Sequence, residues 1–367
     1  MTENLFDRLR ELLESSGPVN WKLAREIAES SAGASEPIEP WVAEEYLELT
    51  RTAAQLVDRA SPLDAVSGTA EARVVDRRRW AAENVEGFGF FAEPLAEKLG
   101  GGALSAPSSD PMAAMFSQLG PALVGMQMGT MAGFMSQRVL GQFDVGLPIG
   151  GPITFVAPNV EAFADDAGLD VRQVRLWVAL HEVVHRAEFS LPWVEDHVAA
   201  LMEDFADRLE LDPQQLQERM GSLEDPESLQ RMLEDPSGFT GLLAGDGHRE
   251  ALDAIQAFMA VTEGYAEWLV DRAAPGMVPD ADAIRTAIDR RRAEPAEGEQ
   301  MLQRILGLEL QHDRYRSGTT FCAEVERRLG EETLSRMWEG PGMLPTLDEL
   351  DDVVGWAARV TLDGFDE

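Results

Sequence analysis

Two histidines four residues apart are the first feature of this sequence that could do chemistry. They belong to the run His181-Glu182-Val183-Val184-His185. In a helix, this spacing places both imidazoles on one face, one turn apart, where they can share a single zinc ion. Glu182 is offset from His181 by about 100° around the helix axis, beside the ion. A general base that deprotonates a zinc-bound water belongs at that position, so the run predicts zinc-dependent hydrolysis.

The alternative interpretation of this run is two core histidines that bond to backbone or carboxylate groups. Val174, Trp177 and Val178 continue the stripe on which both histidines fall, and Asp170 is a suitable N-cap for the same helix. Two imidazoles on a buried apolar stripe would each need a separate polar partner. The apolar surroundings therefore favour the zinc interpretation.

A catalytic zinc site needs a third protein ligand. Members of the metzincin class would have glycine at position 188 and histidine at 191, but this chain has Glu188 and Leu191, which excludes that class. Glu263 is a better candidate, because it lies within the apolar stripe of a helix and a buried carboxylate must be paired or bind a metal. Three alternatives stay open: a buried salt bridge from Glu263 to an arginine, and Glu267 or His312 as the ligand.

Two further motifs lead to a family resemblance. The pattern His181-Glu182-x-x-His185 followed by Glu263-Gly264-Tyr265-Ala266 is similar to the gluzincin arrangement, in which the later glutamate is the third zinc ligand. The whole chain resembles an actinobacterial zincin-like family of zinc-dependent hydrolases that is often labelled as associated with coenzyme F420 biosynthesis. The stretches that carry this resemblance are Val19-Asn20-Trp21, 137–144, 155–159, 177–189, 263–266 and Leu344-Pro345-Thr346.

The resemblance implies a mainly α, zincin-like multi-helical fold with at most a small β element. It also implies a zinc metallopeptidase or hydrolase whose Zn²⁺ is held by His181, His185 and Glu263. The resemblance supplies no substrate; the expected mechanism, with Glu182 as general base, would act on the carbonyl of a peptide or a small amide-containing molecule. The family usually has an apolar residue at the position of His312, so this histidine is not carried over as a ligand.

An oxyanion that forms at the metal would need a further hydrogen-bond donor. Tyr265 and Tyr315 are candidates, and so are His312 and nearby arginines; Tyr315 fits the family pattern. The competing hypothesis for function is a non-catalytic, zinc-stabilised helical protein that acts in assembly or regulation. In that case Glu267 or His312 would close a four-coordinate site.

The elements that must position these residues are predicted to be helical, at 5–15, 20–31, 39–60 and 67–99, with one strand at 153–157. A flexible joint near 100–111 suggests an N-terminal helical lobe, 1–105, and a catalytic lobe, 106–367.

The uncharged run 111–137 carries a small-residue stripe of Gly125, Gly129 and Gly133, which permits close helix approach. Because Pro121 interrupts this run, we expect a buried helical hairpin there rather than a membrane span. In the helix of Glu263, Gly264 likewise indicates the close approach of another element.

The charge balance narrows the function classes. The 367 residues include 31 basic and 66 acidic side chains, a formal net charge of −35, which disfavours nucleic acid and anionic membranes as partners. Hydrophobic residues make up 44%, enough for a packed core. The single cysteine, Cys322, is expected to be a small buried apolar residue. No signal peptide is visible at the N-terminus, so a cytoplasmic location is expected; the oligomeric state is not predicted.

Overall fold

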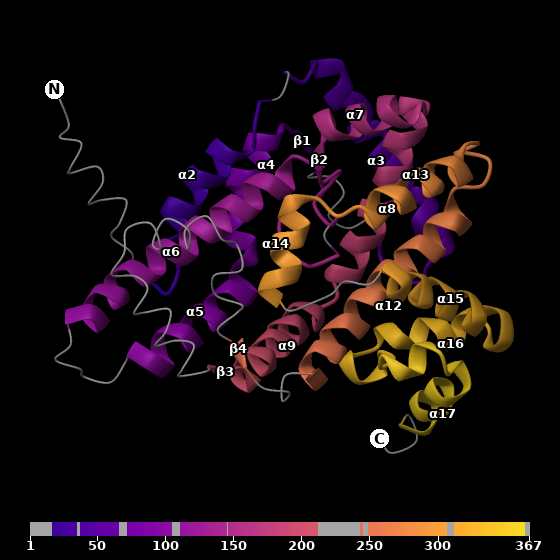
Figure 1. The fold of residues 1–367 in the computed structure, drawn as a ribbon. Helices are drawn as coiled ribbons and strands as arrows, with labels where there is room; N and C mark the ends of the chain where they lie inside the picture. The colour runs from indigo at the N-terminus through magenta and orange to yellow at the C-terminus, as the bar shows by residue number, and fades with distance from the viewer. Residues whose placement is uncertain are drawn as a thin grey trace.

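The computed structural model describes residues 17–34, 37–65, 72–104, 111–144, 146–211, 243–244, 249–306 and 312–363. The fold is mainly α, as predicted (Figure 1). The longer helices are α2 (Trp21–Ser31), α3 (Pro40–Ala60), α4 (Arg77–Asn84), α5 (Gly89–Leu104), α6 (Pro111–Ser136), α7 (Ala157–Ala167), α8 (Val171–Phe189), α9 (Val194–Arg208), α12 (Arg249–Ala273), α13 (Ala281–Ala293), α14 (Glu297–Leu306), α15 (His312–Leu329) and α17 (Val353–Asp363). Short elements complete the described chain: η2 (Val85–Phe88), α16 (Glu331–Ser335), η4 (Arg336–Trp338), η5 (Pro341–Met343), η6 (Asp348–Leu350) and the strands β1 (Arg73–Val75), β2 (Thr154–Val156), β3 (Glu210–Leu211) and β4 (Leu243–Ala244).

Side-chain caps begin two helices where the sequence predicts them. The Asn20 side chain accepts a hydrogen bond from the Leu23 amide at 3.0 Å at the start of α2. Asp170 accepts one from the Gln173 amide at 3.0 Å at the start of α8. Such caps satisfy amides that have no partner within the helix. The predicted helix at 5–15 lies outside the described residues.

The glycine stripe of α6 brings α2 into close contact, and the two helices lie side by side (Figure 1). A Cβ atom added at Gly125 or Gly129 would collide with the backbone carbonyl oxygen of Asn20 or Ala24. One added at Gly133 would collide with Ser31. The predicted hairpin is wrong, however, because α6 is one helix that contains Pro121 in its interior.

A small parallel sheet joins two distant parts of the chain. The predicted strand is confirmed as β2, which pairs with β1 in the register Val74 opposite Phe155. The sequence interpretation of 67–99 as one helix is therefore wrong. Within that range, β1 comes first, Asp76 then caps α4 through the Arg79 amide at 2.8 Å, and η2 and α5 follow. Pairing with a strand 81 residues away outweighs the local helical pattern.

The helices that carry the candidate ligands form the centre of the fold. Helix α8 packs against α3 and α12, and α15 packs along α12 (Figure 1). At that contact, a Cβ atom on Gly264 would overlap the backbone of Gly318, and one on Gly318 would overlap the Ala260 carbonyl. The close approach predicted from Gly264 is confirmed.

The structure also bears on the expectations for the single cysteine and for a membrane span. Cys322 is fully buried and free, as predicted. Among the described residues, no helix combines the length and the apolarity that crossing a bilayer requires. The division into two lobes stays a prediction.

Candidate metal centre

Three side chains predicted as ligands converge between α8 and α12. The Nε2 atom of His181 lies 3.5 Å from Glu263 Oε2, and that of His185 lies 3.4 Å from Glu263 Oε1. One ligand atom from each residue lies within 4.8 Å of the others, and all three side chains are buried. Among the residues that the structure describes, no other such group of three occurs.

The histidine nitrogens fit a metal ion. Within the described chain, the Nε2 atoms of His181 and His185 are buried and have no hydrogen-bond partner. A buried polar atom without a partner is costly, and a cation placed between these nitrogens and the Glu263 carboxylate would satisfy both. The donor set of two imidazoles and one carboxylate is typical of catalytic zinc sites.

Aromatic side chains hold the two imidazoles on α8. Trp177 stacks on His181 with ring centroids 5.5 Å apart, and Phe189 stacks on His185 at 5.4 Å. The four residues are spaced at intervals of four, so they form a continuous row along one helix face. This row restricts the rotation of both rings and aims their Nε2 atoms at α12.

A second carboxylate orients His185. Glu188 Oε2 lies 2.7 Å from His185 Nδ1, and both side chains are fully buried. This contact favours a proton on Nδ1 and leaves the Nε2 lone pair for a metal. Burial lowers the pKa of His185, but the Glu188 and Glu263 carboxylates outweigh burial and raise it. Sequence reasoning used Glu188 only to exclude the metzincins; its spacing of three from His185 was the available signal.

Glu182 lies beside the histidines and is held by backbone amides. Its Oε2 accepts hydrogen bonds from the Gln142 amide at 2.8 Å and the Phe143 amide at 3.1 Å, and its Oε1 accepts from Phe143 at 3.2 Å. Burial raises the pKa of Glu182 to about 8, against the opposing effects of His185 and the two amides. A nearby cation would favour its ionised form.

An arginine from α13 completes the surroundings of Glu263. Arg292 Nη2 lies 2.8 Å from Glu263 Oε2. Burial would raise the pKa of Glu263, but Arg292 and His185 outweigh it and hold that pKa well below its usual range. The sequence left two interpretations open for Glu263, a metal ligand or a buried salt bridge to an arginine. The structure is consistent with both at once, because the carboxylate faces both histidines and Arg292. Arg292 keeps it ionised, as a metal ligand must be.

Glu267, the alternative ligand, has other partners. It bonds to Arg292, lies 3.3 Å from Arg285 Nη1 and accepts a hydrogen bond from Thr319 at 2.8 Å. It does not belong to the group of converging ligand atoms. Glu263 is thus the third candidate ligand, and Glu267 anchors α13 and α15 to α12.

Comparison with known proteins places the chain by its sequence and its fold. The family model of the zincin-like metallopeptidases matches residues 19–357. The chain belongs to this family. A crystal structure from Chloroflexus aurantiacus, described provisionally as a hydrolase with a novel fold, is similar at 25% sequence identity with a TM-score of 0.68. The alignment covers 94% of this zincin-like chain and 99% of that one. A search of curated proteins finds no match.

Of the two tyrosines expected as oxyanion donors, the structure describes the side chain of Tyr265 but not that of Tyr315. The Tyr265 hydroxyl lies 2.9 Å from Ser61 Oγ, and its ring packs against Trp268 and Trp338. Two residues along a helix correspond to about 200°, so Tyr265 points away from the side of α12 that carries Glu263. The side chains of Tyr315 and His312 lie outside the described residues, so their roles in this zincin-like site stay predictions.

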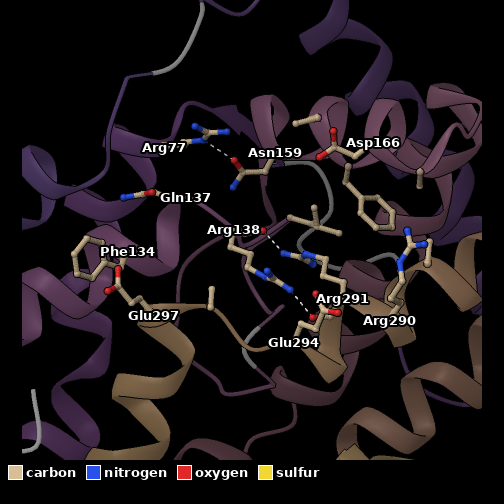
Figure 2. Close-up of a pocket in the computed structure, with 16 residues that line it drawn as sticks. Arg77, Phe134, Gln137, Arg138, Asn159, Asp166, Arg290, Arg291, Glu294 and Glu297 are labelled. Atoms are coloured by element: carbon tan, nitrogen blue, oxygen red, sulfur yellow. Dashed lines mark hydrogen bonds between the residues drawn. The ribbon is translucent and has the colours of Figure 1, made fainter.

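An open pocket of about 580 Å³ is lined by residues that include Arg138, Leu140 and Arg291. Figure 2 shows Arg138 and Arg291 in the middle of this pocket, where each donates to the other's backbone carbonyl. Arg291 also lies 3.3 Å from the Asp144 carboxylate. None of the candidate metal ligands lines this pocket.

Proposed function

We propose that this chain is a zinc-dependent metallopeptidase or amide hydrolase. The observation that carries the proposal is the pair of buried, unpartnered Nε2 atoms of His181 and His185, which face Glu263 with Glu182 beside them. Membership of the zincin-like family supports a hydrolytic role. The similarity to the Chloroflexus aurantiacus structure, which is described provisionally as a hydrolase, supports it as well.

In the proposed mechanism, the three ligands hold the ion and Glu182 moves the proton. When bound, zinc supplies the Lewis acidity that lets a water molecule lose a proton near neutral pH and that polarises a carbonyl group. Glu182 accepts the proton of the attacking water on a carboxylate oxygen and then donates it to the leaving nitrogen. Arg292 keeps Glu263 ionised throughout, which preserves the charge of the ligand set.

The proposed substrate is a peptide or a small amide-containing molecule. A net charge of −35 repels nucleic acid and anionic lipid, so neutral or cationic substrates would approach most readily. The long-range field would raise their association rate at low ionic strength, and added salt would weaken this effect.

Replacement of Glu182 by glutamine tests the mechanism. The Glu182→Gln variant keeps the shape of the side chain, and its one carbonyl oxygen can accept the Gln142 and Phe143 amides that bond to Oε2, but the carboxamide loses the acceptor at Oε1 and cannot take up a proton. We expect one zinc ion per chain, measured by mass spectrometry of the metal, and the loss of cleavage of a fluorogenic peptide library. Glu26→Gln, on the exposed face of α2, is the matched control and should cleave at the wild-type rate. Full activity of Glu182→Gln would refute the mechanism.

The burial of the whole site favours a second candidate, a non-catalytic zinc-stabilised protein in assembly or regulation. His181, Glu182, His185 and Glu263 are each at most 3% exposed. A structural site binds zinc through four protein ligands, whereas a catalytic one leaves a position for water. A crystal structure of the zinc-loaded protein distinguishes them, because three protein ligands with a bound water support the enzyme and four protein ligands support the structural role.

A further inference from the structure

The segment Leu140–Asp144 passes directly over Glu182, and we call these five residues the clamp. They fall within the stretch 137–144 that carries part of the family resemblance but has no function in the proposed mechanism. The clamp contacts Glu182 through backbone atoms: two amides donate to its carboxylate, and the Gly141 backbone lies against its end.

Gly141 is required by this contact. Its backbone torsions are not in the left-handed region, so conformational freedom does not explain a glycine there. A Cβ atom at this position would instead overlap the carboxylate carbon of Glu182, closer than the 3.0 Å that real Cβ atoms respect. The absence of a side chain therefore allows the amides of Gln142 and Phe143 to reach both carboxylate oxygens.

Three anchors fix the clamp itself. At its start, the Leu140 carbonyl accepts the Val156 amide of β2 at 3.0 Å. In the middle, Gln142 Nε2 donates to Asn84 Oδ1 at 2.5 Å and to a backbone carbonyl at 2.6 Å. At its end, the Asp144 carboxylate accepts the Leu140 amide at 2.9 Å and is held by Arg291. The clamp is thus attached to β2, α4 and α13.

We propose that the clamp positions Glu182 as the general base, with Gly141 and the Gln142 and Phe143 amides as its positioning groups. An ionised carboxylate has about four acceptor sites, and the three amide contacts leave room for one more donor, the water that Glu182 would deprotonate. Fixed donors also stabilise the charge on Glu182 without reorganisation. This inference rests on the proposed function, because it assigns a role to a segment that acts through Glu182.

The test replaces Gly141 by alanine, with Gly342→Ala as the control, since no atom lies within 4 Å of a Cβ at Gly342. A carboxylate displaced by roughly 1 Å loses on the order of 100-fold in rate. We therefore expect kcat of Gly141→Ala to fall about 100-fold. Its KM and its zinc dissociation constant should stay within about threefold of wild type, since neither measures the position of the base.

A second variant removes a donor without adding bulk. Incorporation of phenyllactic acid at position 143 replaces the Phe143 amide by an ester oxygen and keeps the side chain. Loss of a single fixed donor typically costs about 10²–10³ in kcat at an oxyanion, and a smaller drop of at least tenfold is expected here. Wild-type kcat in both variants, or loss of zinc together with activity, would overturn the proposal.

Crystal structures of the zinc-loaded proteins separate this inference from the proposed function. If wild type binds zinc but cleaves nothing, the proposed function fails. The position of the Glu182 carboxylate then still tests whether the clamp positions this side chain. A Glu182 carboxylate that leaves its wild-type position in Gly141→Ala but not in Gly342→Ala supports the clamp. An unmoved carboxylate in Gly141→Ala refutes it.

Discussion

The contact between Glu188 and His185 predicts how strongly the protein binds zinc. Its 2.7 Å separation lies in a fully buried environment, so the contact is not screened by bulk solvent. Groups that orient a metal-bound histidine typically contribute 10–100-fold to metal affinity, or about 1.4–2.7 kcal/mol. Glu188→Gln keeps a hydrogen-bond acceptor and loses only the charge, so the lower end of that range is expected. Glu188→Ala loses both, so the upper end is expected.

Competition with a fluorescent chelator at pH 7 measures the zinc dissociation constants. We expect about 10-fold weaker binding for Glu188→Gln and about 100-fold weaker binding for Glu188→Ala. Glu26→Gln on α2 is exposed and should bind zinc as tightly as wild type. At a fixed zinc excess, the gain in unfolding free energy from the metal should shrink by the same 1.4–2.7 kcal/mol, roughly.

The order of the three affinities is the decisive result. Wild-type zinc affinity in Glu188→Ala, with the metal-free protein still folded by circular dichroism, would refute the claim that Glu188 orients His185. Equal losses in the glutamine and alanine variants would show that the carboxylate charge, rather than the hydrogen bond, is the whole contribution.

Two further predictions concern stability. Gly318→Ala places a Cβ atom against the Ala260 carbonyl and should lower the free energy of unfolding by about 1–3 kcal/mol in chemical denaturation, whereas Gly342→Ala should change it little; equal stabilities would contradict the close packing of α12 and α15. Because burial raises the pKa of Glu182 to about 8, the folded metal-free protein holds a proton that the unfolded chain releases above its usual pKa of 4.5. Stability in EDTA should therefore fall by a few kcal/mol between pH 5 and 8 in wild type relative to Glu182→Gln, and parallel pH profiles would contradict this assignment.

Local rules explain what could be predicted about the fold. The N-caps Asn20 and Asp170 and the glycines of α6 act through neighbours within a turn or through one helix face, so a single segment contains their signal. Predictions failed where distant contacts decide. β1 exists because its backbone pairs with β2, and Pro121 stays within α6 although proline disfavours a helix interior.

The same division applies to the metal centre. His181 and His185 could be paired from sequence, because a spacing of four within one helix fixes their relation whatever surrounds them. The choice between Glu263 and Glu267 could not be made, because both lie on one face of α12, one turn apart. Arg285 of α13 and Thr319 of α15 bond to Glu267, while Glu263 faces the histidines.

The sequence alone therefore determined the candidate ligand types, the residue proposed as general base and a helical scaffold for them, since each depends on spacing within a helix. The tertiary structure decided which carboxylate meets the histidines, which one orients His185 and how Glu182 is held. The last of these depends on the clamp, about 40 residues before Glu182 in the chain. There, backbone amides donate to Glu182, and the absence of a Cβ atom at Gly141 lets them come close enough. These contacts join segments that are distant in the sequence, so they form only when the helices pack together.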